Sequence, residues 1–425
     1  MVANNSIKRS FQLLISCYFL SQCAVSTESE IPISKEGFHY SEMDLSKVIP
    51  YGLIENESEY HLVYSNEDTW AQASSNDLIN WSFTRKIPIS AQSSGGIVID
   101  EANQSGLGGI DQQPWLIYYE EDGEISLKYS LDKTNWIDAN IDIPEEVVGA
   151  PHISKRPDTE EWILTVSKGQ VASILVSNDL ITWRKMTELT LPSDRKALLT
   201  FVNDRCIVMT GGKDPVYAVG RIESNKFIIE SSFKPFKLFS EDLDLTVGLI
   251  SNIPTMIHTV GNRILGIAQS IDLSDTAISL VPSEKITNVT ATKRRGKLSK
   301  LKGETSSRFT FSIDGFQEGF SIRLFNEQGE SLIVGFDDGF LIDKTKASSA
   351  FDGERVNLDW DLDGNEVQFD VIIDYAAIEV VINDGEIVIP LEVNSVFIYN
   401  QIEVTVDQRK YDARAVIYTL DKSLI

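Results

Sequence analysis

The stretch that decides the fold runs from Phe38 to Tyr64 and reads FHYSEMDLSKVIPYGLIENESEYHLVY. Its last part, Glu59 to Tyr64, alternates between polar and apolar side chains. Alternation with a period of two is typical of a strand that buries one face and leaves the other in solvent. The stretch therefore predicts a half-buried β-strand over residues 59–64.

Downstream of this stretch, a short pattern of the form S-x-D-x-x-x-W occurs three times, at Ser75–Trp81, Ser130–Trp136 and Ser177–Trp183. Each copy follows a short predicted strand. We expect the Asp to cap a turn through its own backbone and the Trp to pack where the next strand begins. Short strands repeating at a period near 50 residues are typical of propeller blades. We therefore interpret the pattern as structural rather than ligand-binding.

The strand groups predict an all-β chain, with a five-bladed β-propeller over residues 35–282 and a β-sandwich over 283–425. The blades are expected to begin near Tyr51, Gly96, Pro151, Leu198 and Ile253. Between the two parts, the basic passage Thr290–Lys302 is predicted to be a solvated connection. The sandwich is predicted from strands separated by turns at Asp337-Asp338-Gly339, Asp352-Gly353, Asp363-Gly364 and Asn383-Asp384-Gly385.

The first 26 residues are typical of a secretory signal, since Lys8-Arg9 precede an apolar run and small residues follow. Ala24-Val25-Ser26 would suit ordinary signal cleavage. Leu20-Ser21-Gln22-Cys23 instead resembles a bacterial lipoprotein box, which would place a lipid anchor on Cys23. Both alternatives predict an exported protein that is periplasmic, at the cell surface or extracellular. Past the signal, no apolar stretch approaches the roughly 18 residues of a membrane helix.

Charge and side-chain chemistry limit the function classes further. The formal net charge of −25 argues against nucleic acid or an acidic membrane surface as a partner, but it is compatible with a neutral sugar. Cys206 is the only cysteine beyond the signal, so a disulfide framework is excluded. The four histidines are scattered without metal-ligand spacing, and the sequence predicts no metal site and no cofactor.

Two parts of the chain resemble glycoside hydrolase family 32, the invertases, levanases and inulinases that cut β-fructosides. The opening stretch aligns without a gap to that family's FHYTPEKNWMNDPNGLVYYDGEYHLFYQ, with matches at Phe38-His39-Tyr40, Pro50, Gly52-Leu53 and Glu59-Tyr60-His61-Leu62. The second part, DYAAIEVVINDGE at residues 374–386, resembles the D-R-S-S-V-E-V-F-V-N-D-G signature of the family's C-terminal sandwich. The resemblance covers Phe38 to the C-terminus and implies the same propeller and sandwich.

The same resemblance locates the positions where catalysis would occur. In the family, the Asp of N-D-P-N-G is the nucleophile, the Asp of R-D-P binds sugar hydroxyls, and the Glu of E-C-P-D-L-F is the acid/base. The corresponding residues of this chain are Ile49, Ala150 and Lys196. A lost general acid costs roughly 10²–10⁴-fold in rate, and no glycosyl-enzyme forms without a nucleophile. With an ordinary pKa of about 10.4, Lys196 would also be a weak acid at neutral pH.

Three functions are compatible with this pattern. The first is a non-hydrolytic protein that binds a fructan or fructoside, because aromatic, hydroxyl and amide groups suit neutral sugars; the candidate ligand-binding residues are Tyr51, Trp70, Gln72, Ser94 and Gly95. For Trp70, packing within a blade is the alternative. The second is an active β-fructofuranosidase with relocated carboxylates, for which the candidates are Asp44, Glu145, Glu146 and Asp194. The third is a protein-interaction module with a closed pocket.

Overall fold

The computed structural model describes residues 39–419, apart from 42–46, 67, 158, 225, 240–242, 261–263, 284–291, 304–305, 349–352, 363, 365, 375–376, 394 and 396. The predicted signal with Cys23, and the candidate Asp44, lie outside the described residues. Over the described residues the regular secondary structure is strand, apart from two short 3₁₀ turns. None of the described helices is long and apolar enough to cross a membrane.

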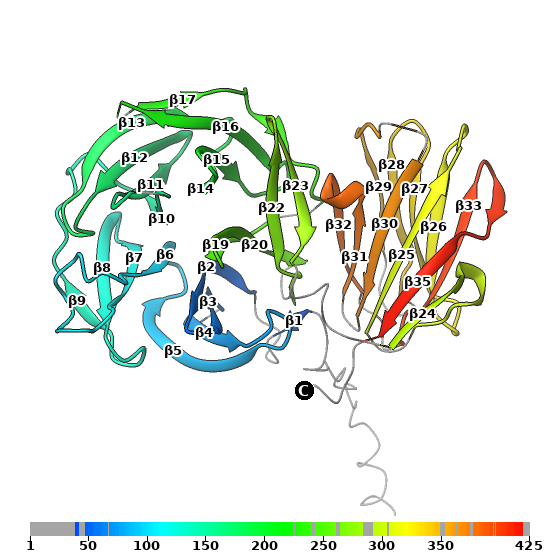
Figure 1. Cartoon of the computed structure of the whole chain (residues 1–425), viewed down its shortest axis with the longest axis horizontal. Coiled ribbons are helices and arrows are strands. Elements are labelled where there is room, and N and C mark those ends of the chain that lie inside the picture. The colour runs from blue at the N-terminus through cyan, green and yellow to red at the C-terminus, as the bar shows by residue number, and fades with distance from the viewer. Residues whose placement is uncertain are drawn as a thin grey trace, which may run out of the picture. The chain divides into compact units, whose positions relative to one another are not determined.

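The first part of the chain forms five antiparallel sheets within the described residues. Figure 1 shows them as blades in a ring, with β2, β6, β10, β14 and β19 around the centre. The blades are β2 (Ile49–Asn56), β3 (Glu59–Ser65), β4 (Thr69–Ser75) and β5 (Ser82–Ser90); β6 (Gly95–Ile99), β7 (Trp115–Glu121), β8 (Glu124–Ser130) and β9 (Ile137–Ala139); β10 (Ala150–Lys155), β11 (Trp162–Lys168), β12 (Val171–Ser177) and β13 (Arg184–Thr190); β14 (Ala197–Val202), β15 (Arg205–Thr210), β16 (Val216–Glu223), β17 (Lys226–Ile229) and the short β18 (Lys234–Pro235); and β19 (Leu245–Ile250), β20 (Ile253–Val260), β22 (Gln269–Ser274) and β23 (Ala277–Pro282), joined by the short β1 (Tyr40–Ser41) and β21 (Ile264–Leu265).

The first strand of each blade contacts the first strands of its two neighbours, and β19 contacts β2, so the ring is closed. This radial arrangement leaves only short, protected sheet edges at the centre. The strand predicted at residues 59–64 is present as β3, but it is buried on both faces rather than half-buried, because its blade packs against neighbouring strands on either side. One blade start was wrong: the fifth blade begins with β19, whereas Ile253 begins its second strand, β20.

The physical reason is Gly248, in the middle of β19. Glycine weakens the strand signal of a sequence because it has no side chain to pack. Here it is required, since a Cβ at this position would lie 1.7 Å from the carbonyl oxygen of Leu53 on β2. The close approach of β19 to β2, which closes the ring, therefore requires Gly248. The same glycine weakens the sequence signal for β19.

The three S-x-D-x-x-x-W turns have the capping geometry that the sequence predicted. In the third copy, the Asp179 carboxylate accepts hydrogen bonds from the backbone N–H of Ile181 at 2.9 Å and of Thr182 at 2.7 Å. It also accepts one from Ser177 Oγ at 2.9 Å. Asp77 and Asp132 are bonded in the same way. The residue after each Asp is in the left-handed region, with φ of 63–65°. The carboxylate therefore stabilises a backbone conformation that side chains disfavour.

Substituting Asp179 by Ala is expected to lower the free energy of unfolding by about 2 kcal/mol, because it removes three hydrogen bonds to a charged acceptor. Urea unfolding followed by tryptophan fluorescence measures this loss. Asp194→Ala is the matched control, since Asp194 is exposed in a loop of the same part of the chain. Equal stability of the two variants would contradict the structural interpretation of the turns.

The second part of the chain is a sandwich of two six-stranded sheets, ordered β24-β35-β25-β30-β31-β32 and β29-β28-β27-β26-β33-β34. Their inward side chains form one large apolar core. The strands are β24 (Thr292–Lys297), β25 (Ser307–Asp314), β26 (Phe320–Phe325), β27 (Ser331–Phe336), β28 (Phe340–Lys346), β29 (Arg355–Leu358), β30 (Glu366–Ile373), β31 (Ala377–Ile382), β32 (Ile387–Glu392), β33 (Gln401–Val406), β34 (Arg409–Tyr411) and β35 (Arg414–Thr419), with the 3₁₀ turns η1 (Leu298–Lys300) and η2 (Asn383–Gly385).

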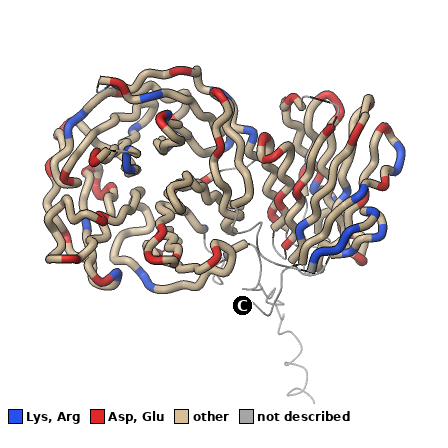
Figure 2. Tube along the Cα trace, in the orientation of Figure 1, with Lys and Arg blue, Asp and Glu red and all other residues tan. Residues whose placement is uncertain are grey.

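The basic passage predicted as a solvated connection contains β24, and that prediction was wrong. The strand pairs with β35 along its whole length and forms an edge of its sheet. Its described charged side chains, Lys293, Arg294, Arg295 and Lys297, are exposed, and Figure 2 shows the strand mostly in blue. Charged residues on an edge strand oppose pairing with another chain. They also remove the apolar alternation by which the sequence would have revealed the strand.

A buried group of charged residues joins the two parts of the chain. His39 Nε2 lies 3.1 Å from Glu379 Oε1, and His39 Nδ1 lies 3.3 Å from Asp374 Oδ2. Glu379 also accepts hydrogen bonds from the Ile267 N–H at 2.8 Å and from Gln269 Nε2 at 3.1 Å. The side chains of His39, Asp374 and Glu379 are at most 5% exposed. The two stretches that carried the family resemblance, some 340 residues apart, therefore meet in one buried network.

Candidate functional site

The three positions at which the resemblance expects catalytic residues lie at the starts of first strands. Ile49 begins β2, Ala150 begins β10, and Lys196 directly precedes β14. First strands of a propeller run in the same direction, so their starts gather at one end of the ring. All three residues are partly exposed. We call the group at this end the axial site; its residues are Ile49, Tyr51, Gly95, Ala150, Lys196 and Asp244.

Lys196 connects three blades of the axial site. Its Nζ donates a hydrogen bond to the Gly95 carbonyl oxygen at 2.6 Å and lies 5.3 Å from the centre of the Tyr51 ring. Burial lowers the pKa of the Lys196 ammonium to about 7, and the nearby Asp244 carboxylate opposes this only in part. The prediction that Lys196 is a weak acid at neutral pH is therefore wrong, because it assumed the pKa of a solvated lysine.

Tyr51 lies beside Lys196 but offers little surface, since it is 4% exposed. One face of its ring stacks on Trp70, with ring centres 4.2 Å apart and an interplanar angle of 22°. Its hydroxyl oxygen accepts a hydrogen bond from Ser65 Oγ at 3.2 Å, and burial raises its pKa to about 12. Trp70 is completely buried, and its Nε1 donates to the Ser93 carbonyl oxygen. In this structure Trp70 supports Tyr51 from behind rather than lining the site.

Of the other candidate ligand-binding residues, some lie near Lys196 and others lie in the blade interior. Gln72 is 1% exposed, and its amide nitrogen lies 3.1 Å from His61 Nδ1, so it is part of the blade interior. Ser94 is partly exposed and directly precedes Gly95. A Cβ on Gly95 would lie 2.2 Å from the Tyr118 carbonyl oxygen and 2.6 Å from Trp70 Cη2, so only glycine fits. Of the five candidates, the structure places Tyr51, Ser94 and Gly95 near Lys196, and Trp70 and Gln72 behind them.

Asp244 is the axial residue that sequence reasoning missed. It directly precedes β19, and its Oδ2 lies 3.1 Å from Lys47 Nζ. Its charge acts on both Lys196 and Tyr51. Its position in the chain could have identified it. Asp244 lies at the start of the fifth blade, and Ile49 lies at the start of the first. The candidates Glu145, Glu146 and Asp194 are all exposed in loops.

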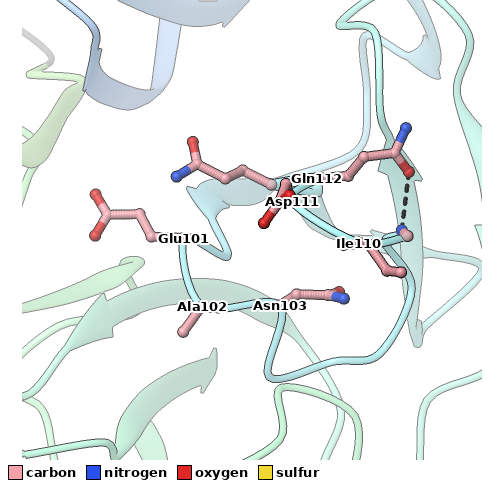
Figure 3. Close-up of a pocket in the computed structure, with 8 residues that line it drawn as sticks. Glu101, Ala102, Asn103, Ile110, Asp111 and Gln112 are labelled. Atoms are coloured by element: carbon pink, nitrogen blue, oxygen red, sulfur yellow. Dashed lines mark hydrogen bonds between the residues drawn. The ribbon is translucent and has the colours of Figure 1, made fainter.

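A separate hollow lies in the loop between β6 and β7, and Figure 3 shows its polar lining. This loop follows the end of a first strand, so it lies away from the strand starts that form the axial site. Its volume is about 470 Å³, and it is lined by Glu101, Ala102, Asn103, Gly109, Ile110, Asp111, Gln112 and Gln113. The Asp100 carboxylate holds the loop by accepting the N–H of Gln104 and of Ser105, each at 2.8 Å.

Comparison with known sequences finds one family model that matches the C-terminal part of the chain and several relatives that match longer parts of it. Residues 278–393 match the family described as glycosyl hydrolases family 32 C terminal. The chain is 22% identical over 445 residues to a levanase from Bacillus sp. (strain L7), covering 83% of this chain and 48% of the levanase. It is 28% identical over 186 residues to a fructan β-fructosidase from Streptococcus mutans serotype c, covering 37% of this chain and 12% of that protein. The chain thus spans about half or less of these relatives.

Solved structures match over most of the chain. An exo-inulinase from Aspergillus awamori superposes with a TM-score of 0.74 at 18% identity, covering 91% of this chain and 98% of the inulinase. A family 32 β-fructofuranosidase from Bombyx mori gives 0.70 at 16% identity, covering 99% of both chains. A sucrose-6-phosphate hydrolase from Lactobacillus gasseri gives 0.70 at 17% identity, covering 91% and 93%. These matches confirm the predicted fold class, and with the sequence matches they support the resemblance to glycoside hydrolase family 32.

Proposed function

We propose that the axial site binds a fructan or fructoside without hydrolysing it. The similarity to a levanase and to an exo-inulinase supports a fructose-containing saccharide as the ligand. The location supports it as well, because the axial site gathers partly exposed groups from several blades at one end of the ring. Lys196, Ser94 and the polar atoms of Asp244 supply hydrogen-bonding groups suited to sugar hydroxyls.

The observation that carries the proposal is the set of side chains at the three strand starts. Retaining glycoside hydrolysis needs two carboxyl groups about 5–5.5 Å apart, one as nucleophile and one as acid/base. Ile49 and Ala150 can take neither role. In the described part of the axial site, Asp244 is the one carboxylate, and it is ion-paired with Lys47. The Lys196 cation would also oppose the positive charge that develops on the sugar in the transition state.

Calorimetric titration of inulin-type and levan-type oligosaccharides into the full chain tests the proposal. We expect saturable binding, with the saccharide recovered at its original length by chromatography. Ala150→Trp should abolish binding, because the larger side chain would occupy the partly exposed start of β10. Lys226→Met, on the outermost strand of the fourth blade, is the control and should bind normally. Absence of heat with every oligosaccharide would contradict the proposal and favour an interaction module.

A second candidate function follows from two observations on the same site. The pKa of about 7 makes Lys196 a competent general acid at neutral pH, since catalytic acids work best near the ambient pH. Asp244 places a carboxylate near it. An active β-fructofuranosidase would therefore use Lys196 as the acid and Asp244 as the nucleophile or base. Such an enzyme would lose its activity on Asp244→Asn, which separates it from the binding protein proposed first.

A further inference from the structure

Lys196 is a cation without an ion-pair partner in the described part of the chain. Its contacts there are the Gly95 carbonyl oxygen and the Tyr51 ring, both uncharged. The nearest carboxylate in electrostatic terms, Asp244, is paired with Lys47 at 3.1 Å. Charges withdrawn from water are normally paired, because the loss of hydration is otherwise uncompensated. The lowered pKa of Lys196 has the same cause.

The described groups packed around Lys196 do not supply a negative charge that pairs with it. Tyr51 on β2 stays neutral, because burial raises its pKa to about 12. His152 on β10 is also neutral, because burial and the Lys196 charge lower its pKa to about 3. Ile49 and Ala150 carry no charge. Among the described groups of the axial site, Asp244 is ion-paired with Lys47, and protonated Lys196 is a positive charge in a chain whose total is −25.

We propose that the axial site selects saccharides that carry an anionic group, such as a carboxylate, sulfate or phosphate ester, and that Lys196 donates hydrogen bonds to this group. The inference rests on the proposed binding function and specifies its ligand. A lysine ammonium has three N–H donors, and the Gly95 carbonyl accepts from one of them. The other two are free to form charge-assisted hydrogen bonds, which are about twice as strong as neutral ones.

The pH dependence of binding follows from the state of Lys196. An anion bound at Nζ stabilises the charged ammonium and so raises its pKa above the value of about 7 in the free protein. Binding therefore takes up protons, and affinity for an anionic sugar falls as the pH rises above 7. A sulfate ester is the best probe, because its own charge stays constant over this range. A phosphate ester is less suitable because it titrates near pH 6.

Calorimetry at pH 6 and pH 8.5 tests the proposal with four probes: fructose, fructose 1-sulfate, fructose 6-sulfate and inorganic sulfate. At pH 6 we expect at least one sulfated sugar to bind about 10- to 100-fold more tightly than fructose, the range for a hydrogen bond to a charged group. Lys196→Met should remove this advantage, while the exposed control Lys226→Met should keep it. Lys196→Arg should keep it at both pH values, because arginine does not titrate in this range.

The possible outcomes separate this inference from the function on which it rests. If fructose binds as tightly as both sulfated sugars, the anion selectivity is wrong and the binding function stands. Tighter binding of the sulfated sugars that persists in Lys196→Met would also overturn it. If inorganic sulfate binds as tightly as the sulfated sugars, the site recognises the anion alone, and selection of an anionic saccharide is wrong. If no sugar binds, both proposals fail.

Discussion

Replacing Glu379 by Ala is expected to lower the free energy of unfolding by about 3–5 kcal/mol, the cost of breaking a buried ion pair by removing one partner. The substitution would leave His39 Nε2, the Ile267 N–H and the Gln269 amide without their acceptor, while His39 Nδ1 keeps Asp374. Because the network joins His39 and the fifth blade to the sandwich, the loss should affect both parts. Urea unfolding of the full chain, followed by tryptophan fluorescence, measures it.

Glu403→Ala is the matched control for this experiment. Glu403 also belongs to the sandwich and lies 2.8 Å from Lys410 Nζ, but both side chains are at least 36% exposed. Exposed ion pairs contribute only about 0–1 kcal/mol. If Glu379→Ala and Glu403→Ala lose the same stability, the buried network does not hold the two parts together.

The same network predicts how stability changes with pH. Burial by itself would lower the pKa of His39, but hydrogen bonds and charge from Asp374 and Glu379 raise it from 6.5 to about 9. The folded state therefore binds this proton more tightly than the unfolded state. The resulting contribution, about 3 kcal/mol from the size of the shift, is fully present below pH 6.5 and is lost as the pH rises from 6.5 through 9. His39→Phe should flatten the stability profile across this interval.

Hydrolysis is the second property for which we expect a large effect. Fructose release from sucrose, inulin or levan should be at least about 10⁴-fold slower than with a catalytically intact relative, since loss of the general acid alone costs up to that factor. Lys196 could replace the acid because of its lowered pKa, but Ile49 cannot replace the nucleophile. Without a nucleophile no covalent intermediate forms. Only the positioning of the bound substrate could then contribute to the rate.

A fructose-release assay on the purified full chain, with an exo-inulinase as positive control, measures this. Asp244→Asn is the informative variant, because Asp244 is the described carboxylate of the axial site. Turnover that survives repurification and disappears in Asp244→Asn would replace the binding protein by an active enzyme. Turnover that is unchanged in Asp244→Asn would indicate another carboxylate, such as Glu145, Glu146 or Asp194.

The parts of the fold that the sequence predicted are those with strong local chemistry. The Asp–Trp turns were predicted because one carboxylate caps its own backbone, as Asp179 does. Strand β3 was predicted from its alternating side chains, although both of its faces proved to be buried. By contrast, β19 depends on Gly248 meeting Leu53 on another blade, and β24 is a strand because β35 pairs with it. Neither long-range contact leaves a local signal.

In the candidate site, too, some features could be predicted from the sequence and others could not. Its position at the strand starts could be predicted, because Ile49, Ala150 and Lys196 follow from the alignment of motifs. The exposure of the individual side chains could not be predicted from the sequence. Trp70, for example, is completely buried beneath Tyr51. The acidity of Lys196 also depends on neighbours from other blades. Asp244 was missed because the strand that positions it was missed.

If the axial site holds an intact saccharide, a crystal of the full chain soaked with a fructo-oligosaccharide should show it there. We expect an uncleaved saccharide at the starts of β2, β10 and β14, with an oxygen within hydrogen-bond distance of Lys196 Nζ. A cleaved saccharide with fructose bound near Asp244 would contradict the binding function and show an enzyme. A saccharide bound elsewhere on the chain, with the axial site empty, would contradict it altogether.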